Sequence, residues 1–281
     1  MGTDKRARQK ANRAKKIETV QKIEKRDQRR QYAIVVVLLA AGLAAGAYLL
    51  SISGDGGDAA ETTTTSSNEA PSTTAPVEEA QPAVSAPEPG ATLTGTPECP
   101  AEDGSSERTT TFGQAPPTCI DATATYQAEI ETTLGSVVVE LDPVKAPITV
   151  NNFVFLARYH YYDGTPFHRI IPGFVIQGGD ATGSPLGTGS PGYVIDEEPP
   201  APGEYKVGSL AMAKGQGTKS TGSQFFIVTG AQGVNLPNDY SLFGTVTEGL
   251  DVVSAIEALP TDAQDYPTEE IYITSVTITE K

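Results

Sequence analysis

Residues 165–180 read TPFHRIIPGFVIQGGD, a stretch in which one arginine, Arg169, stands among aromatic and β-branched residues. Such residues favour extended strands, and a Pro-Gly pair such as Pro172-Gly173 is typical of a turn. The stretch therefore predicts a strand over residues 167–177 that is interrupted at Pro172 and Gly173.

Short β-rich runs separated by Gly, Pro, Asn and Asp continue on both sides of this stretch, and residues 123–281 have the size of one domain. Residues 126–132 and 136–141 flank a short turn, which predicts a hairpin. The remaining strands are expected over residues 207–212, 224–228, 241–246 and 271–278.

Two segments of the same domain have the pattern of helices. Residues 147–159 place apolar side chains at intervals of three and four residues from Val150 onward, and Pro147 suits a first helical turn. A second helix is expected over residues 250–259. Many short antiparallel strands with two helices favour a closed barrel, because closure removes exposed sheet edges.

The sequence gives little support to metal, nucleotide or covalent chemistry. The chain has two histidines, His160 and His168, and neither has an acid or a cysteine at metal-ligand spacing. Residues 215–224 (GQGTKSTGSQ) lack the elbow and following helix of a serine hydrolase, and also the Gly-Lys-Ser/Thr of a phosphate loop. We therefore expect no metal and no cofactor.

Three blocks in order along the chain resemble the cyclophilin family of peptidyl-prolyl isomerases. They are residues 165–180, residues 209–227 (SLAMAKGQGTKSTGSQFFI) and residues 242–246 (LFGTV). The match runs from about Tyr126 to the C-terminus. The resemblance implies a mainly β fold, a closed eight-stranded antiparallel barrel capped by two α-helices, within residues 123–281. It also implies peptidyl-prolyl cis/trans isomerase activity.

The reaction implied by this resemblance is rotation about the bond before proline. Breaking amide resonance costs about 18 to 20 kcal/mol, and the cis and trans forms of an Xaa-Pro bond are close in energy. A fixed donor near the prolyl nitrogen binds the twisted amide better than either planar form. The resemblance assigns this role to Arg169 and assigns its orientation to Gln177. The alternative for Arg169 is a surface ion pair.

The resemblance also implies a set of substrate-binding residues. Lys214 and Gly215 correspond to positions where the family pairs backbone groups with an extended substrate. Phe225 and Phe226 alternate on one strand, so one is expected in the core and Phe226 in the pocket. The full set is His168, Phe174, Val175, Ala213, Lys214, Gly215, Gln224, Phe226, Leu236 and Tyr240.

The chain departs from the family pattern at three places. Asn235 stands where well-known members have a tryptophan that contacts cyclosporin, which predicts weak inhibition by cyclosporin. Tyr240 stands where many members have a histidine, and a tyrosine can still stack and donate. The loop over residues 213–222 is one residue longer than the common form, and Lys214 and Lys219 within it could change substrate choice.

The N-terminal part has a different composition. Residues 1–30 contain twelve Lys or Arg and four acids, whereas the rest of the chain contains eight bases and thirty-one acids. Residues 32–52 carry no charge and have the length of a membrane-spanning helix. Because basic flanks stay in the cytoplasm, residues 1–31 are expected inside and the isomerase domain outside the cell membrane. A cleaved signal peptide is the alternative, and the acidic domain makes nucleic acid an unlikely partner.

Residues 53–96 are rich in Thr, Ser, Pro, Ala and Glu and are expected to form a disordered linker, because they offer little apolar surface to bury. Residues 97–122 form a lead-in segment bounded by Cys99 and Cys119. Both cysteines lie on the side where oxidising conditions permit a disulfide, so we expect them to pair. Two free thiols are the alternative.

Together these observations favour a membrane-anchored bacterial enzyme that isomerises Xaa-Pro bonds in secreted or cell-envelope proteins. We expect a monomer. Two other functions remain open on the sequence: a proline-segment binding module with little catalysis, and a holdase chaperone that uses exposed apolar surface. Retention of both Arg169 and Gln177 argues against the binding module.

Overall fold

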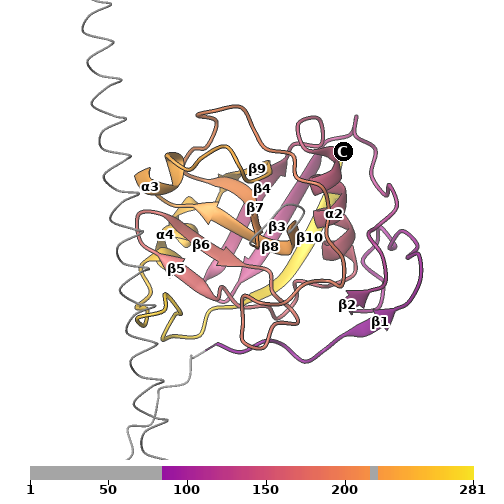
Figure 1. Cartoon of the computed structure of the whole chain (residues 1–281), viewed down its shortest axis with the longest axis horizontal. Helices are drawn as coiled ribbons and strands as arrows, with labels where there is room; N and C mark the ends of the chain where they lie inside the picture. The colour runs from indigo at the N-terminus through magenta and orange to yellow at the C-terminus, as the bar shows by residue number, and fades with distance from the viewer. Residues whose placement is uncertain (1–83, 216–220) are drawn as a thin grey trace, which may run out of the picture. The chain divides into compact units, whose positions relative to one another are not determined.

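Eight strands form one curled antiparallel sheet in the computed structural model, which describes residues 84–215 and 221–281 (Figure 1). They are β3 (Tyr126–Thr132), β4 (Gly135–Leu141), β5 (Arg169–Ile171), β6 (Val175–Gly178), β7 (Ser209–Lys214), β8 (Thr221–Val228), β9 (Leu242–Glu248) and β10 (Ile273–Glu280). Their order across the sheet is β10-β3-β4-β9-β7-β8-β6-β5. The predicted mainly β fold with eight antiparallel strands is therefore confirmed.

The two edges of the curled sheet meet where residues 164–167 run beside the start of β10. The amide of Ile273 donates to the carbonyl of Thr165, and the amide of Gly164 donates to the carbonyl of Ile273, both at 2.8 Å. The amide of Phe167 donates to Ile271 at 3.2 Å. These bonds satisfy edge groups that would otherwise be exposed.

The strands alternate between a buried and an exposed face. In β3, Tyr126, Ala128 and Ile130 are fully buried, whereas Glu129 between them is exposed. This period of two directs one face of each strand into the barrel. The hairpin predicted from residues 126–141 is confirmed, because β3 pairs with β4 over its whole length.

The two predicted helices are confirmed as α2 (Pro147–Arg158) and α4 (Leu250–Glu257), which cover opposite sides of the sheet in Figure 1. No residue next to α2 caps its N-terminus, and Glu198 does so from a distant loop. Its carboxylate accepts hydrogen bonds from the amides of Ile148 and Thr149 at 3.1 and 2.8 Å. A third helix, the short α3 (Ala231–Val234), was not predicted.

Residues 84–96 correct the expected extent of the disordered linker. They include β1 (Ala91–Leu93), which pairs in parallel with β2 (Thr109–Phe112). Val84 and Phe112 are each 1% exposed and join the main core. The prediction for residues 53–96 is therefore wrong over 84–96, because its few apolar side chains find partners that composition alone does not show.

The C-terminal end of the lead-in segment is attached to α2. Cys99 and Cys119 form a disulfide with Cα atoms 5.4 Å apart, as predicted. The amide of Cys119 donates to the side-chain oxygen of Asn151 at 2.7 Å, and the Asn151 side chain donates to Pro117 at 2.9 Å. Residues 84–122 thus pack as part of the folded unit.

Among residues 84–215 and 221–281, no helix combines the length and apolarity needed to cross a membrane. The basic segment 1–31, the expected transmembrane helix 32–52 and most of the expected linker lie outside the described residues.

Substitution of Phe112 tests whether the N-terminal extension, residues 84–122, stabilises the domain. Its ring lies 5.0 Å from Phe155, 5.4 Å from Tyr159 and 6.1 Å from Tyr193. We expect Phe112→Ala to lower the free energy of unfolding by about 3 to 5 kcal/mol, because it leaves a cavity. Urea denaturation measures this, with the exposed Thr92→Ala as control. A loss below about 1 kcal/mol would contradict the role of this packing.

Candidate functional site

The floor of the candidate site is a row of side chains on four adjacent strands. Arg169 of β5 pairs with Gln177 of β6, Gln177 pairs with Phe226 of β8, and Phe226 pairs with Ala211 of β7. Directly paired residues on neighbouring strands project from the same face of a sheet. The register therefore brings a cation, an amide and an aromatic ring together, although they are far apart in sequence.

A cavity of about 130 Å³ opens above this row. All of the side chains that line it belong to the set predicted from the sequence. They are Arg169, Phe174, Val175, Gln177, Ala213, Lys214, Phe226, Leu236 and Tyr240. We call this cavity the arginine pocket.

A second hollow, of about 330 Å³, shares Gln177, Ala213 and Lys214 with the arginine pocket. It contains two further predicted residues, Gly215 and Gln224. The two hollows are therefore adjacent. Lys219 lies outside the described residues.

A series of side-chain amide hydrogen bonds holds Gln177 in place. Its side-chain nitrogen donates to the side-chain oxygen of Gln224 at 3.0 Å. The Gln224 nitrogen in turn donates to the carbonyls of Gly187 and Gly189, both at 3.1 Å. Because the donors and acceptors alternate along this chain, the side-chain oxygen of Gln177 stays available as an acceptor beside Arg169.

Asp180 organises the loop that supplies those carbonyls, and the sequence reasoning missed it. The Asp180 side chain is buried and accepts four backbone N–H groups. They belong to Thr182, Gly183, Gly187 and Gly189, at 2.7 to 3.0 Å. A buried carboxylate is stable here because its oxygens are hydrogen-bonded. The glycine-rich run that follows Asp180 was the available signal.

Two aromatic side chains form the apolar wall of the arginine pocket. Phe226 is 4% exposed, and the Tyr240 ring meets it edge-on at 5.4 Å. The buried Tyr205 hydroxyl donates to the Tyr240 carbonyl at 2.7 Å and accepts from the Tyr240 amide at 3.1 Å. Phe225 is fully buried in the barrel core, so the predicted alternation of Phe225 and Phe226 is confirmed.

One edge of the arginine pocket is charged. The Lys214 ammonium lies 2.9 Å from the Asp239 carboxylate and 5.5 Å from the centre of the Tyr240 ring. The hydrogen bond to Asp239 raises the pKa of Lys214. Asn235, where a tryptophan was noted as missing, is exposed at the end of α3, and its side chain donates to the Ala231 carbonyl at 2.7 Å.

Arg169 has an ionic partner that the sequence did not indicate. Its Nε lies 3.4 Å from the Asp265 carboxylate, and both side chains are 41% exposed. The surface ion pair considered as an alternative for Arg169 therefore exists. It does not exclude a role in the pocket, because the guanidinium has further donors.

His168 does not line either hollow. It is 2% exposed and lies beside Gln224, a residue that lines the second hollow. Burial lowers the pKa of its imidazole to about 4. His168 is thus covered in this structure, and its contact with the substrate stays a prediction.

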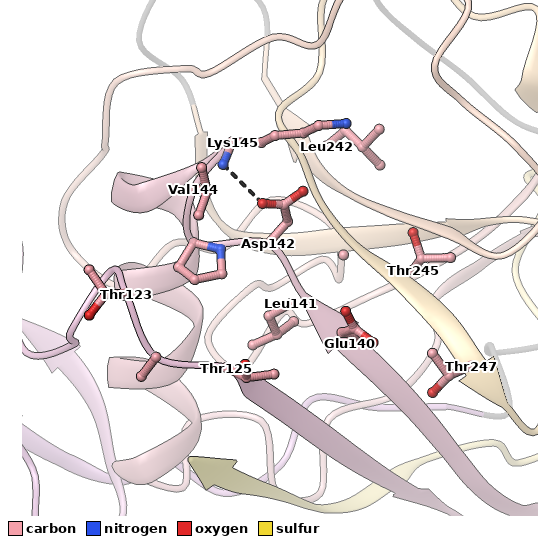
Figure 2. Close-up of a pocket in the computed structure, with 13 residues that line it drawn as sticks. Thr123, Thr125, Glu140, Leu141, Asp142, Val144, Lys145, Leu242, Thr245 and Thr247 are labelled. Atoms are coloured by element: carbon pink, nitrogen blue, oxygen red, sulfur yellow. Dashed lines mark hydrogen bonds between the residues drawn. The ribbon is translucent and has the colours of Figure 1, made fainter. Parts of the chain in front are cut away.

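A larger hollow of about 510 Å³ lies on β4 and β9, away from the residues predicted for the site (Figure 2). Figure 2 shows threonine and aliphatic side chains around it, with Glu140, Asp142 and Lys145. The Lys145 amide donates to Asp142 at 3.0 Å. The polar residues that line it are exposed or half-buried, so none of them is removed from water in the way that is typical of catalytic groups.

The buried His168 makes stability depend on pH. The unfolded chain binds a proton near the ordinary pKa of 6.5, whereas the folded chain binds it only near 4, so lowering the pH through this window favours unfolding. We expect the free energy of unfolding to fall by about 2 kcal/mol more between pH 7 and pH 5 in the parent than in His168→Gln. Urea titrations at both pH values measure this, and parallel pH profiles would contradict it.

Comparisons with known proteins identify a family and several relatives of this chain. Residues 127–278 match the family described as "Cyclophilin type peptidyl-prolyl cis-trans isomerase/CLD". Peptidyl-prolyl cis-trans isomerase-like 1 of Gibberella zeae is 40% identical over 158 residues, covering 54% of this chain and 94% of that protein. The human protein of the same name is 42% identical over 150 residues, covering 51% and 87%.

Solved structures are similar as well. A crystal structure of a cyclophilin-type isomerase of Cryptosporidium parvum is 33% identical, with a TM-score of 0.51, and covers 56% of this chain and 99% of that one. A second crystal structure of that protein, in the presence of the dipeptide Ala-Pro, matches with a TM-score of 0.50. These relatives come from eukaryotes and do not support the expected bacterial, membrane-anchored form. The chain belongs to the cyclophilin-type peptidyl-prolyl cis-trans isomerases.

Proposed function

We propose that Arg169 accelerates rotation about Xaa-Pro bonds by non-covalent stabilisation of the twisted amide. The observation that carries this proposal is the position of Arg169 in the lining of a small cavity whose other wall is aromatic. The aromatic wall holds the proline ring, and the cation at the edge of the cavity meets the prolyl nitrogen. No bond has to be made or cut, so no nucleophile or metal is required.

The chemistry follows from the change in the amide during rotation. In the planar amide the nitrogen lone pair is delocalised into the carbonyl. At the twisted geometry the lone pair returns to nitrogen and can accept a hydrogen bond. A guanidinium fixed near that nitrogen therefore binds the twisted state more strongly than either planar state, which lowers the barrier. Arginine suits this role because it stays charged and holds its donors in a rigid fork.

Gln177 is proposed to orient Arg169 and to bind the substrate backbone. It stands directly opposite Arg169 in the β5–β6 register, and the Gln224 side chain accepts its N–H at 3.0 Å. The side-chain oxygen of Gln177 is then left as an acceptor in the arginine pocket. The crystal structure of the Cryptosporidium parvum relative in the presence of Ala-Pro supports a proline-containing ligand for this chain too.

Substitution of the arginine tests the proposal. We expect Arg169→Ala to lower kcat/KM on an Ala-Pro peptide by about 100-fold, because one preorganised donor to the transition state is lost. Exchange NMR between the cis and trans peptide measures the rate in the full-length protein. Asp142→Ala, in the hollow of Figure 2, is the control.

The outcomes separate the isomerase from its alternatives. A parent protein that binds the Ala-Pro peptide without accelerating exchange would favour the proline-segment binding module. Suppression of aggregation that survives Arg169→Ala, together with an inactive parent, would favour the holdase chaperone. In either case the proposed role of Arg169 fails.

We also propose that the enzyme is a membrane-anchored bacterial form that acts on secreted or cell-envelope proteins. The support is the sequence: an uncharged segment at residues 32–52 follows a strongly basic segment at residues 1–31. Proline isomerisation takes tens of seconds or longer without catalysis, so newly exported chains are suitable substrates. We propose that the protein acts as a monomer.

Alkaline extraction of membranes tests the anchor. We expect the full-length chain to remain in the membrane pellet and the variant Val37→Arg with Leu43→Arg to be released, because each charge costs about 2.5 to 3.5 kcal/mol at a helix centre. Externally added protease should remove the isomerase domain from intact cells. Mass spectrometry of the N-terminus then checks the alternative, since loss of residues 1–52 would reveal a cleaved signal peptide.

A further inference from the structure

The partner of Arg169 comes from a loop outside the row of site residues. Asp265 lies in the loop between α4 and β10, and its carboxylate is 3.4 Å from the Arg169 Nε. Asp265 does not line the arginine pocket. It therefore contacts the candidate catalytic side chain from outside the arginine pocket.

The backbone of this loop is closed by the carboxylate of Asp262. That carboxylate accepts the amides of Gln264 at 2.8 Å and Tyr266 at 2.9 Å. The Asp262 amide donates to the Tyr266 carbonyl at 2.8 Å, and the Asp265 amide donates to the Asp262 carbonyl at 3.2 Å. The loop is thus defined by its own hydrogen bonds and not by Arg169.

Asp265 has a left-handed backbone, with φ of +67°. Among the described residues, His160 is the other non-glycine residue with positive φ. Residues other than Gly, Asn and Asp rarely adopt this conformation. Such a conformation persists when the surrounding structure determines it, and here it directs the Asp265 carboxylate to Arg169.

The loop is also attached to β5, which carries Arg169, and to the loop that supports Gln177 through Gln224. The amide of Ile170, next to Arg169 on β5, donates to the Asp265 carbonyl at 2.9 Å. The Tyr266 hydroxyl donates to the Leu186 carbonyl at 3.0 Å. Leu186 belongs to the loop that Asp180 organises and that holds Gln224, the partner of Gln177.

We infer that Asp265 is a positioning residue for Arg169. Its carboxylate pairs with the Nε side of the guanidinium and leaves the terminal nitrogens for the substrate. Because an arginine side chain has many rotamers, an anchored Nε reduces the freedom lost when the transition state binds. This inference rests on the proposed function of Arg169 and extends it.

Substitutions of Asp265 in the full-length protein test the inference. We expect Asp265→Ala to lower kcat about 10-fold on the Ala-Pro peptide with less than a twofold change in KM, because the contact acts on the transition state. Asp265→Asn should restore kcat to within about threefold of the parent, since its amide oxygen accepts from Nε and asparagine tolerates the left-handed backbone. Glu269→Ala, which removes an exposed acid from the next turn, is the matched control.

A double variant shows whether the effect passes through Arg169. In the Arg169→Ala background, Asp265→Ala should cause no further loss. The Arg169 Nε–H signal in NMR should shift in Asp265→Ala and stay near its parent position in Glu269→Ala, and this readout does not depend on activity. If Asp265→Ala unfolds the protein, Asp265→Gly takes its place in each comparison, because glycine accepts the left-handed backbone and also removes the carboxylate.

Three results would overturn the inference: parent activity in Asp265→Ala, a higher rate in that variant, or an equal loss in the Arg169→Ala background. Failure of the proposed function is distinguishable from all three. It would appear as an unchanged rate in Arg169→Ala itself, whatever the behaviour of Asp265.

Discussion

The hydrogen-bond register between β5, β6 and β8 is the constraint on which the site depends. It places Arg169, Gln177 and Phe226 on one face, and it sends their neighbours Ile170 and Ile176 into the barrel core. A slip of one residue in this register would exchange the two faces. The apolar burial that stabilises the barrel therefore also fixes the position of the candidate catalytic pair.

Polar groups outside the pocket hold its polar side chains in place. Asp180 satisfies four backbone amides and thereby defines the loop that binds Gln224. The Tyr205 hydroxyl fixes the backbone of Tyr240 through two hydrogen bonds. Asp265 positions Arg169 through an ion pair. Asp180 and Tyr205 are satisfied by hydrogen bonds, and such networks specify one arrangement of the residues they contact.

The folded unit is larger than the region that matches the family. Residues 84–126 precede the matched segment 127–278, and they pack on α2 through Phe112 and through the disulfide segment. This extension lies on the side of α2, at a distance in Figure 1 from β5 and β6. It stabilises the barrel without entering the arginine pocket.

Sequence patterns were sufficient for the parts of the molecule that depend on local order. The strand alternation, the hairpin from β3 to β4 and both longer helices follow from periodicity, since a strand or helix buries a regular face. The residues of the arginine pocket followed from resemblance to a family, because those side chains lie in contiguous blocks. A pairing of the two cysteines followed from their number and expected compartment.

Features that join distant segments could not be predicted in this way. Tyr205, Asp265 and the cap by Glu198 act through contacts with residues that are remote in sequence, and a single sequence carries no signal for them. Asp180 differs, because its partners lie in the glycine-rich run that follows it, but the run alone does not show that it folds around the carboxylate. A motif position also does not state whether a side chain is covered, as His168 is in this structure. Local periodicity determines elements, whereas the packing of those elements determines which polar groups meet, since burial and hydrogen bonding depend on three-dimensional neighbours.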